Sequence, residues 1–360
     1  MLIGLFGGIR MRIALICPSN LLYMPYVSNY ERILKENYVD YDIINWDRFS
    51  IEKESEFTYR DSKIGHQRSF LDYFKFSRFV LNILRMNRYD KVIVFGIQLV
   101  FFFKRYLIKE YSNKFIIDIR DYNRIIKYFN IGKLIDNSNF TVLSSPGYKD
   151  WLPKSNKYVI NHNTQIERLD ELRKVEREIK NKDIISISYI GSIRDYKINT
   201  NFIDSLKNKK HIALNFHGEG SINKDIENYV IDQIIDNVRL TGRYEKEEEA
   251  KLYKGSDFIN VLIPNDSINS RTLLPNRLYN AAVYGKPIIA FKGTYLSEII
   301  KKYNLGIVVG SFFNIEREIM EYINNFNFEL YEKGRSSFFG TVIEENKEFS
   351  IRIKKFISEN

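Results

Sequence analysis

The sequence lacks the residues and runs that several classes of protein need. It has a single cysteine, Cys17, in 360 residues, which excludes an internal disulfide and a cysteine cluster for a metal. Cys17 lies in an apolar stretch and is expected to be an inert core thiol. The longest nearly uninterrupted apolar run, Val92 to Phe103, spans twelve positions. A bilayer crossing needs roughly 20. These absences predict a cytoplasmic protein without a membrane-spanning helix.

Charge of one sign is not concentrated anywhere in the chain. The net charge of +10 comes from 55 basic and 45 acidic residues, and no block of like charges forms a tail. A basic balance of this kind fits an acidic substrate, an anionic membrane surface or nucleic acid. Nucleic acid is the least favoured of the three, because the basic residues do not collect on one helix or strand.

The first ten residues, MLIGLFGGIR, are too short and too weakly basic for a secretory signal. We therefore expect the folded part to start near Met11. From there, short β-branched runs alternate with longer periodic segments, as in parallel sheets covered by helices on both faces. The expected strands are Arg12–Cys17, Tyr41–Trp46, Lys91–Phe95, Phe115–Ile119, Phe140–Leu143 and Tyr158–Ile160, then Ile184–Ile190, His211–His217, Val238–Leu240, Phe258–Val261, Pro287–Ala290 and Gly306–Val309.

This pattern predicts an α/β protein of two tandem, doubly wound, Rossmann-like units. The expected boundaries are 1–164 for the first unit, 165–182 for a charged linker helix, 183–340 for the second unit and 341–360 for a terminal helix that packs back toward the first. Open parallel sheets bind ligands where their strands end, so the residues that directly follow strands are the candidates for a site.

The segment from Ser270 to Ile289, SRTLLPNRLYNAAVYGKPII, predicts a helix followed at once by a buried strand. Pro275 suits a first helical turn, and Gly285 suits the helix end. The free N–H groups at the helix start, with Arg277 beside them, favour an anion such as a nucleotide diphosphate. The alternative is an ordinary core helix with a basic surface residue.

Two glycine turns follow strands in the second half. Gly191 begins the sequence GSIRDYK, which brings two cations to a helix start and suits phosphate oxygens. Gly218 begins GEGS, which lacks the third glycine of a dinucleotide fingerprint and is a weak signal alone. In the first half, Arg120 and Asp121 follow a strand, either at a site or as a local ion pair.

These motifs together resemble nucleotide-sugar glycosyltransferases of the two-domain GT-B fold, particularly the large retaining family 4. The resemblance runs in the expected order through YIGSIRDYK, NFHGEG, NVRLTGRYEKEEEAKLYKGSDFINVLIP and LLPNRLYNAAVYGKPIIA. In the first half it rests on DIRDYN, TVLSSPGYKDWL and YVINHN. It implies two Rossmann-like domains facing a cleft, with the donor bound by the second.

The resemblance also implies roles for particular residues. Lys197 matches the family's diphosphate-binding lysine, whereas Ser192 stands where the partner arginine is common and Arg194 is a displaced substitute. The family's paired glutamates correspond to Thr272 and Asn280. Of these, Asn280 retains an oxygen for the donor ribose. Neither residue is acidic. The resemblance therefore does not identify the donor sugar, and it leaves open whether the activity is weakened or lost.

A retaining enzyme of this kind needs little general-base help, because the departing phosphate takes the acceptor proton while cations hold its charge. The predicted catalytic residues are Asp121, Arg194 and Lys197; the predicted donor-binding residues are Gly191, Ser192, Gly218, Thr272, Pro275, Asn276, Arg277, Leu278 and Asn280; the predicted acceptor-side residues are Asp118 and Arg120. No metal site and no cofactor are expected.

The acceptor is the least defined part. The aromatic and basic segment 99–109, LVFFFKRYLIK, suits either an anionic bilayer surface or a core helix with a cationic edge. On the first interpretation the protein is peripheral at the inner face of the plasma membrane. Its acceptor is then a lipid-linked saccharide in bacterial capsular or exopolysaccharide synthesis. The function expected is transfer of a sugar from a nucleotide-diphosphate donor to a saccharide. Its alternatives are a non-catalytic nucleotide-sugar-binding subunit and a GT-B nucleotide-sugar epimerase.

Overall fold

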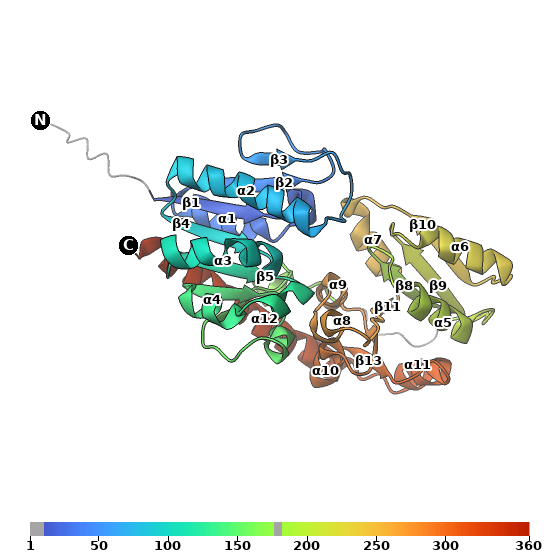
Figure 1. The fold of residues 1–360 in the computed structure, drawn as a ribbon. Coiled ribbons are helices and arrows are strands. Elements are labelled where there is room, and N and C mark those ends of the chain that lie inside the picture. The colour runs from blue at the N-terminus through green and yellow to red at the C-terminus, as the bar shows by residue number, and fades with distance from the viewer. Residues whose placement is uncertain (1–10, 176–181, 360) are drawn as a thin grey trace, which may run out of the picture. The chain divides into compact units, whose positions relative to one another are not determined.

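The computed structural model describes residues 11–175 and 182–359, which form two compact units (Figure 1). Unit 1 comprises Met1–His162 and Glu345–Asn360, and unit 2 comprises Asn163–Glu344. The interpretation of residues 1–10 lies outside the described residues. Each unit is built on one parallel sheet, so the predicted α/β class with two parallel-sheet units is confirmed.

The sheet of unit 1 has seven parallel strands in the order β3-β2-β1-β4-β5-β6-β7. The strands are β1 (Arg12–Cys17), β2 (Asp40–Asp47), β3 (Thr58–Arg60), β4 (Lys91–Phe95), β5 (Phe115–Ile119), β6 (Phe140–Leu143) and β7 (Tyr158–Ile160). The strands β4, β5 and β6 are buried along their whole length, which is why apolar runs predicted them. The edge strand β3 was not predicted, because it is short and partly exposed.

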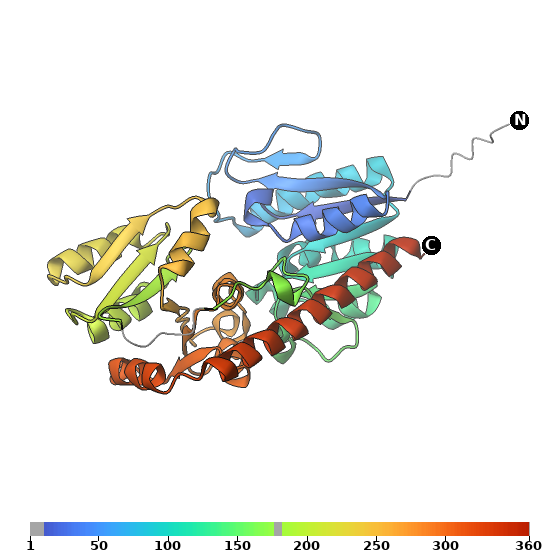
Figure 2. The ribbon, with the colours of Figure 1, turned by 180° about the vertical axis from the view of Figure 1, so that it is seen from behind.

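Helices cover both faces of this sheet. They are α1 (Val27–Glu36), α2 (Phe70–Asn87), α3 (Ile97–Glu110) and α4 (Ile131–Asn137), with 3-10 turns at η1 (Leu21–Tyr23), η2 (Arg124–Tyr128) and η3 (Pro146–Asp150). On one face, Tyr30 and Ile33 of α1 share a core with Phe349 and Ile353 from the C-terminal helix (Figure 2). The core of unit 1 is thus completed by residues that are far away along the chain.

The sheet of unit 2 has six parallel strands in the order β10-β9-β8-β11-β12-β13. The strands are β8 (Ile185–Ile190), β9 (Ile212–His217), β10 (Val238–Gly242), β11 (Phe258–Asn260), β12 (Ile288–Phe291) and β13 (Gly306–Val309). The helices are α5 (Tyr196–Leu206), α6 (Asn223–Asp232), α7 (Glu249–Lys254), α8 (Ile268–Thr272), α9 (Asn276–Val283), α10 (Tyr295–Lys302) and α11 (Ile315–Asn324), with 3-10 turns at η4 (Leu169–Glu171) and η5 (Lys246–Glu248).

Helix α9 is the helix predicted from Ser270 to Ile289. Pro275 takes the N-cap position with an extended backbone, one residue earlier than the first helical turn. Gly285 has a φ of +65° directly after the helix, where a left-handed residue is required. The N–H of Gly285 bonds to the carbonyl of Ala282, and the N–H of Lys286 bonds to that of Ala281. This pair of hydrogen bonds is a Schellman motif, and it turns the chain directly into β12.

The linker helix predicted over residues 165–182 is absent from residues 165–175, which hold only the turn η4. Residues 176–181 lie outside the described residues. The segment follows unit 2 instead, because Ile166 and Leu172 pack against its core and the N–H of Arg173 bonds to the carbonyl of Val283 at 3.0 Å. Apolar residues at helical spacing therefore pack against the core here without forming a helix.

The C-terminal helix α12 (Phe328–Ser358) is 31 residues long and begins well before the expected start at residue 341. Its first part belongs to unit 2 and its last part, from Glu345, to unit 1. The ammonium group of Lys91 donates to the carbonyls of Phe356 and Glu359 and so caps the helix end. No helix within residues 11–175 and 182–359 is both long and apolar enough to cross a membrane.

Candidate functional site

The turn after β8 joins the sheet of unit 2 to the start of α5. Gly191 has a φ of +124° and open space where a side chain would stand. The Tyr189 hydroxyl donates to the Ser192 carbonyl at 2.9 Å, which fixes the turn. Arg194 Nε lies 3.3 Å from the Ser192 hydroxyl oxygen, and Lys197 is exposed in the first turn of α5. The turn therefore offers an open backbone and cations beside a helix N-terminus.

The turn after β9 packs directly onto this first turn. Ile190 and His217 are paired in the sheet, so Gly191 and Gly218 follow their strands at the same level. A Cβ atom on Gly218 would overlap the carbonyl oxygen of Gly191, and one on Gly220 would overlap that of Ile193. The two turns can approach only because these residues are glycines.

Arg277 connects α9 to the carboxyl ends of two strands. Its guanidinium carbon lies 3.6 Å from the centre of the Tyr189 ring, and its Nη1 donates to the Asn260 carbonyl at 2.7 Å. Burial raises the pKa of Asp195 in the first turn, and the charge of Arg277 opposes that shift. The structure thus brings Arg277 to the Gly191 turn, as the diphosphate hypothesis requires.

The neighbours of Arg277 on α9 differ in their exposure. Asn276, the first residue of the helix, is exposed, and Pro275 before it is half-buried. Leu278 is fully buried in the core of unit 2 and contributes packing. Thr272 on α8 is buried too, and its hydroxyl donates to the Ile268 carbonyl at 2.8 Å. The roles predicted for Leu278 and Thr272 in binding the donor stay predictions.

Glu249, the first residue of α7, was missed by the sequence analysis. Its Oε1 accepts a hydrogen bond of 2.9 Å from the Asn280 side-chain amide, and burial raises the pKa of its carboxyl group. In the sequence it is the last of the acidic run in EKEEE, and no local signal separates it from the exposed Glu247 and Glu248.

In unit 1, Asp118 and Arg120 form an internal ion pair. Asp118 is fully buried and accepts from Arg120 Nε at 2.6 Å, Arg120 Nη2 at 2.8 Å and the Tyr30 hydroxyl at 2.6 Å. The guanidinium of Arg120 also donates to the Asn161 carbonyl at 3.0 Å and to the Asn161 side chain at 2.8 Å. This ion pair joins Arg120 to Asp118, whereas the local ion pair considered above was between Arg120 and Asp121. The next residue, Asp121, is exposed.

Within the described residues, no group of three or more histidine, cysteine, aspartate or glutamate side chains is arranged to hold a metal ion.

No family model matches this sequence, and no curated protein matches it. Solved structures do match. A sucrose-phosphate synthase from Thermosynechococcus elongatus is 14% identical with a TM-score of 0.64, covering 97% of this chain and 95% of that one.

Two further solved structures also resemble this chain. The lipopolysaccharide outer core galactosyltransferase WaaB is 13% identical with a TM-score of 0.65, covering 95% of this chain and 99% of that one. Anabaena HepE, solved with UDP and glucose, is 10% identical with a TM-score of 0.61, covering 96% of this chain and 100% of that one. The chain has the GT-B fold. The predicted likeness to GT-B glycosyltransferases is confirmed.

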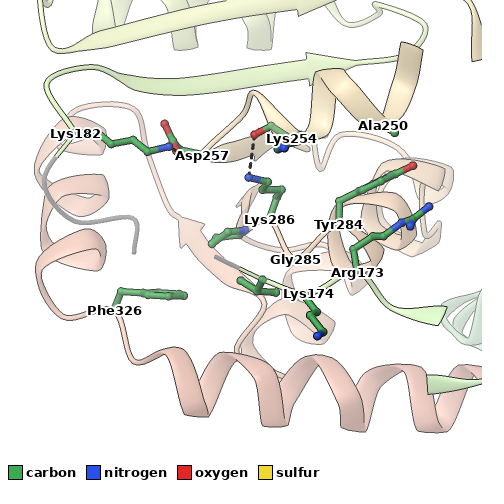
Figure 3. Close-up of a pocket in the computed structure, with 12 residues that line it drawn as sticks. Arg173, Lys174, Lys182, Ala250, Lys254, Asp257, Tyr284, Gly285, Lys286 and Phe326 are labelled. Carbon is green, nitrogen blue, oxygen red and sulfur yellow. Dashed lines mark hydrogen bonds and ion pairs between the residues drawn. The ribbon is translucent and has the colours of Figure 1, made fainter. Parts of the chain in front are cut away.

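Unit 2 of this GT-B chain holds a cavity of about 360 Å³ (Figure 3). Asp257 and Pro287, which line it, directly precede strands, whereas the Gly191 and Gly218 turns follow strands. In the cavity wall Lys182 pairs with Asp257 at 2.5 Å, and the Lys286 ammonium donates to the Lys254 carbonyl at 3.3 Å. None of the predicted site residues lines this cavity.

The aromatic and basic segment 99–109 forms most of helix α3. Leu99, Val100, Phe103 and Leu107 are buried, which fits the core-helix alternative. The exposed apolar side chains of this region belong instead to the start of α2, where Phe70, Leu71 and Phe74 are 57%, 66% and 46% exposed. We call these three residues the α2 patch; the Phe70 ring lies 4.8 Å from that of Phe102 on α3.

Proposed function

We propose that this protein is a retaining glycosyltransferase that moves a sugar from a nucleotide-diphosphate donor to a saccharide acceptor. The observation that carries the proposal is the meeting of the Gly191 and Gly218 turns with Arg277 where the strands of unit 2 end. Two helices, α5 and α9, also begin at this edge without a side-chain hydrogen bond to the cap. The first N–H groups of a helix have no partner within it and suit an anion. The solved complexes of HepE with UDP and with UDP-glucose support a nucleotide-sugar ligand.

The chemistry required is stabilisation of the departing diphosphate. Arg194 lies in the exposed turn after β8, and Lys197 lies in the first turn of α5. Arg277 is held in a fixed orientation by Tyr189 and Asn260. Cations and helix N-termini placed around a leaving group lower the barrier as its charge develops. We propose that the same phosphate oxygens take the acceptor proton, and that Asp121 contacts the acceptor.

Basic side chains perform this task without a metal ion, so we propose that none is required. Chelation with EDTA tests this point directly. Activity that survives EDTA supports it, and activity that is lost with EDTA and restored by Mg²⁺ or Mn²⁺ overturns it.

We propose a lipid-linked saccharide as the acceptor, as in bacterial surface polysaccharide synthesis. The support is the α2 patch beside the exposed cations Lys75, Arg78 and Arg105, a combination suited to an anionic lipid surface. Vesicles that contain phosphatidylglycerol should bind the protein, and the double variant Phe70→Ser/Leu71→Ser should bind them several-fold more weakly. Equal binding by the variant, or no binding by the parent, contradicts the proposal.

The activity is tested by following nucleotide release from UDP-, GDP- and CDP-sugars, with and without lipid-linked saccharide extracts. Release that depends on the acceptor is expected, and Lys197→Ala should lower its rate by about 10²-fold or more.

A non-catalytic binding subunit is the second candidate, because Thr272 is buried and Asn280 is not acidic. Nucleotide binding with no donor consumption under any acceptor would favour it.

A further inference from the structure

Helix α7 brings a carboxylate to the helix that carries the predicted diphosphate cation. One oxygen of Glu249 accepts from Asn280 on α9, and among the described residues the other oxygen has no hydrogen bond. The side chain is half-buried, so it is neither a solvated surface group nor a fully paired core group. A polar group of this kind is available to a ligand.

Glu249 and Arg277 lie close to the same neighbours. Asn280 is three residues after Arg277 on α9, so the two side chains share one face of the helix. Burial and the charge of Glu249 raise the pKa of Tyr244 to about 12, and Arg277 opposes this shift. The pKa of the buried Tyr253 is raised by burial and Glu249, again against Arg277. The carboxylate and the guanidinium therefore act on a common pair of tyrosines.

A carboxylate bound to the helix that carries the predicted diphosphate cation is expected to face a group other than the diphosphate. Two anions would repel each other, whereas a carboxylate is a strong acceptor for hydroxyl donors. In a nucleoside diphosphate the group attached to the phosphates is the ribose, which carries two adjacent hydroxyls. The chemistry of Glu249 matches a hydroxyl-bearing part of the ligand, and the ribose is the one that every nucleoside diphosphate carries, with or without a sugar.

We propose that Glu249 recognises the ribose hydroxyls of the donor nucleotide, with Asn280 as its positioning residue. This inference rests on the proposed function, because it takes the diphosphate to lie at Arg277. It makes Glu249 a specificity residue that separates ribonucleotides from deoxyribonucleotides. A side chain that only joined α7 to α9 would have no such effect.

The test is calorimetric titration of the full chain with UDP, GDP, CDP and ADP, followed by the 2′-deoxy and 3′-deoxy forms of the nucleotide that binds best. The parent should bind the ribonucleotide roughly ten-fold more tightly than at least one deoxy form, as one charge-assisted hydrogen bond would give. Glu249→Gln should lose most of this ratio, with little change in its affinity for that deoxy form. Glu249→Asp should recover part of it.

Two controls separate the possible failures. Glu247→Gln, in the same acidic run but exposed, should keep the ratio, and melting curves show whether each variant is folded. A ratio in Glu249→Gln equal to that of the parent overturns the role of Glu249 and leaves the proposed function standing. Failure of all four nucleotides to bind the folded parent overturns both.

Discussion

Individual glycines determine how closely the two turns of the candidate site approach. Gly218 has a φ of +127°, and a Cβ atom there would overlap the backbone of Gly191. We expect Gly218→Ala to lower the free energy of unfolding by about 2–4 kcal/mol, because both the clash and the backbone conformation oppose a side chain. Gly310, with open space around it, is the matched control. Chemical denaturation should show Gly310→Ala within about 0.5 kcal/mol of the parent.

Glu249 predicts a pH dependence of stability. Burial raises its pKa in the folded protein, so the charged form is disfavoured by folding. Stability from this group is therefore fully present below the ordinary glutamate pKa and is lost as pH rises through the raised value. In thermal melts, the stability of the parent relative to Glu249→Gln should fall as the pH rises above the ordinary glutamate pKa. A relative stability that rises with pH would contradict this.

Residue types and their spacing indicated part of the candidate site. Gly191, Lys197 and Arg277 were found because glycine turns and cations next to helix starts are visible in one stretch of sequence. Glu249 was not, because its significance comes from a contact with Asn280 across 31 positions of the chain. Likewise, the burial of Asp118 and Arg120 depends on Tyr30 and Asn161, which the local sequence does not reveal.

At the scale of elements, buried strands were predictable and lightly buried segments were not. The strands β4, β5 and β6 are mostly apolar and buried from end to end, and their bounds match the prediction. The helix predicted over residues 165–175 was wrong, because apolar residues of this segment pack against the core of unit 2 without a helix. The start of α12 was missed because two glycines, Gly334 and Gly340, interrupt the helical pattern there.

These two glycines of α12 should respond in opposite directions to the same substitution. A Cβ atom on Gly334 would overlap the Tyr303 carbonyl oxygen, whereas nothing lies within 4 Å of one on Gly340. Gly340→Ala should stabilise the protein by roughly 0.5–1 kcal/mol through helix propensity. Gly334→Ala should destabilise it by about 1–3 kcal/mol. Denaturation midpoints of the two variants provide the comparison, and a similar shift in both would contradict this packing.

At the scale of the whole molecule, α12 gives each unit part of its core. Phe338 and Phe339 pack in unit 2, and Phe349, Ile353 and Phe356 are 0–1% exposed in unit 1. Truncation after Glu344 should expose the core of unit 1 to water and make it susceptible to limited proteolysis, while unit 2 stays protected. Equal resistance of both units in the truncated chain would contradict this assignment.

The central claim is that a nucleotide diphosphate binds unit 2 against Lys197, Arg277 and the starts of α5 and α9. The most direct measurement is calorimetric titration with UDP-, GDP- and CDP-sugars of the parent, Lys197→Ala, Arg277→Ala and the control Lys301→Ala, an exposed lysine on α10. Loss of one hydrogen-bonded cation should weaken binding by roughly ten-fold or more in each site variant and leave the control unchanged. Binding like that of the parent in both folded site variants would contradict the account.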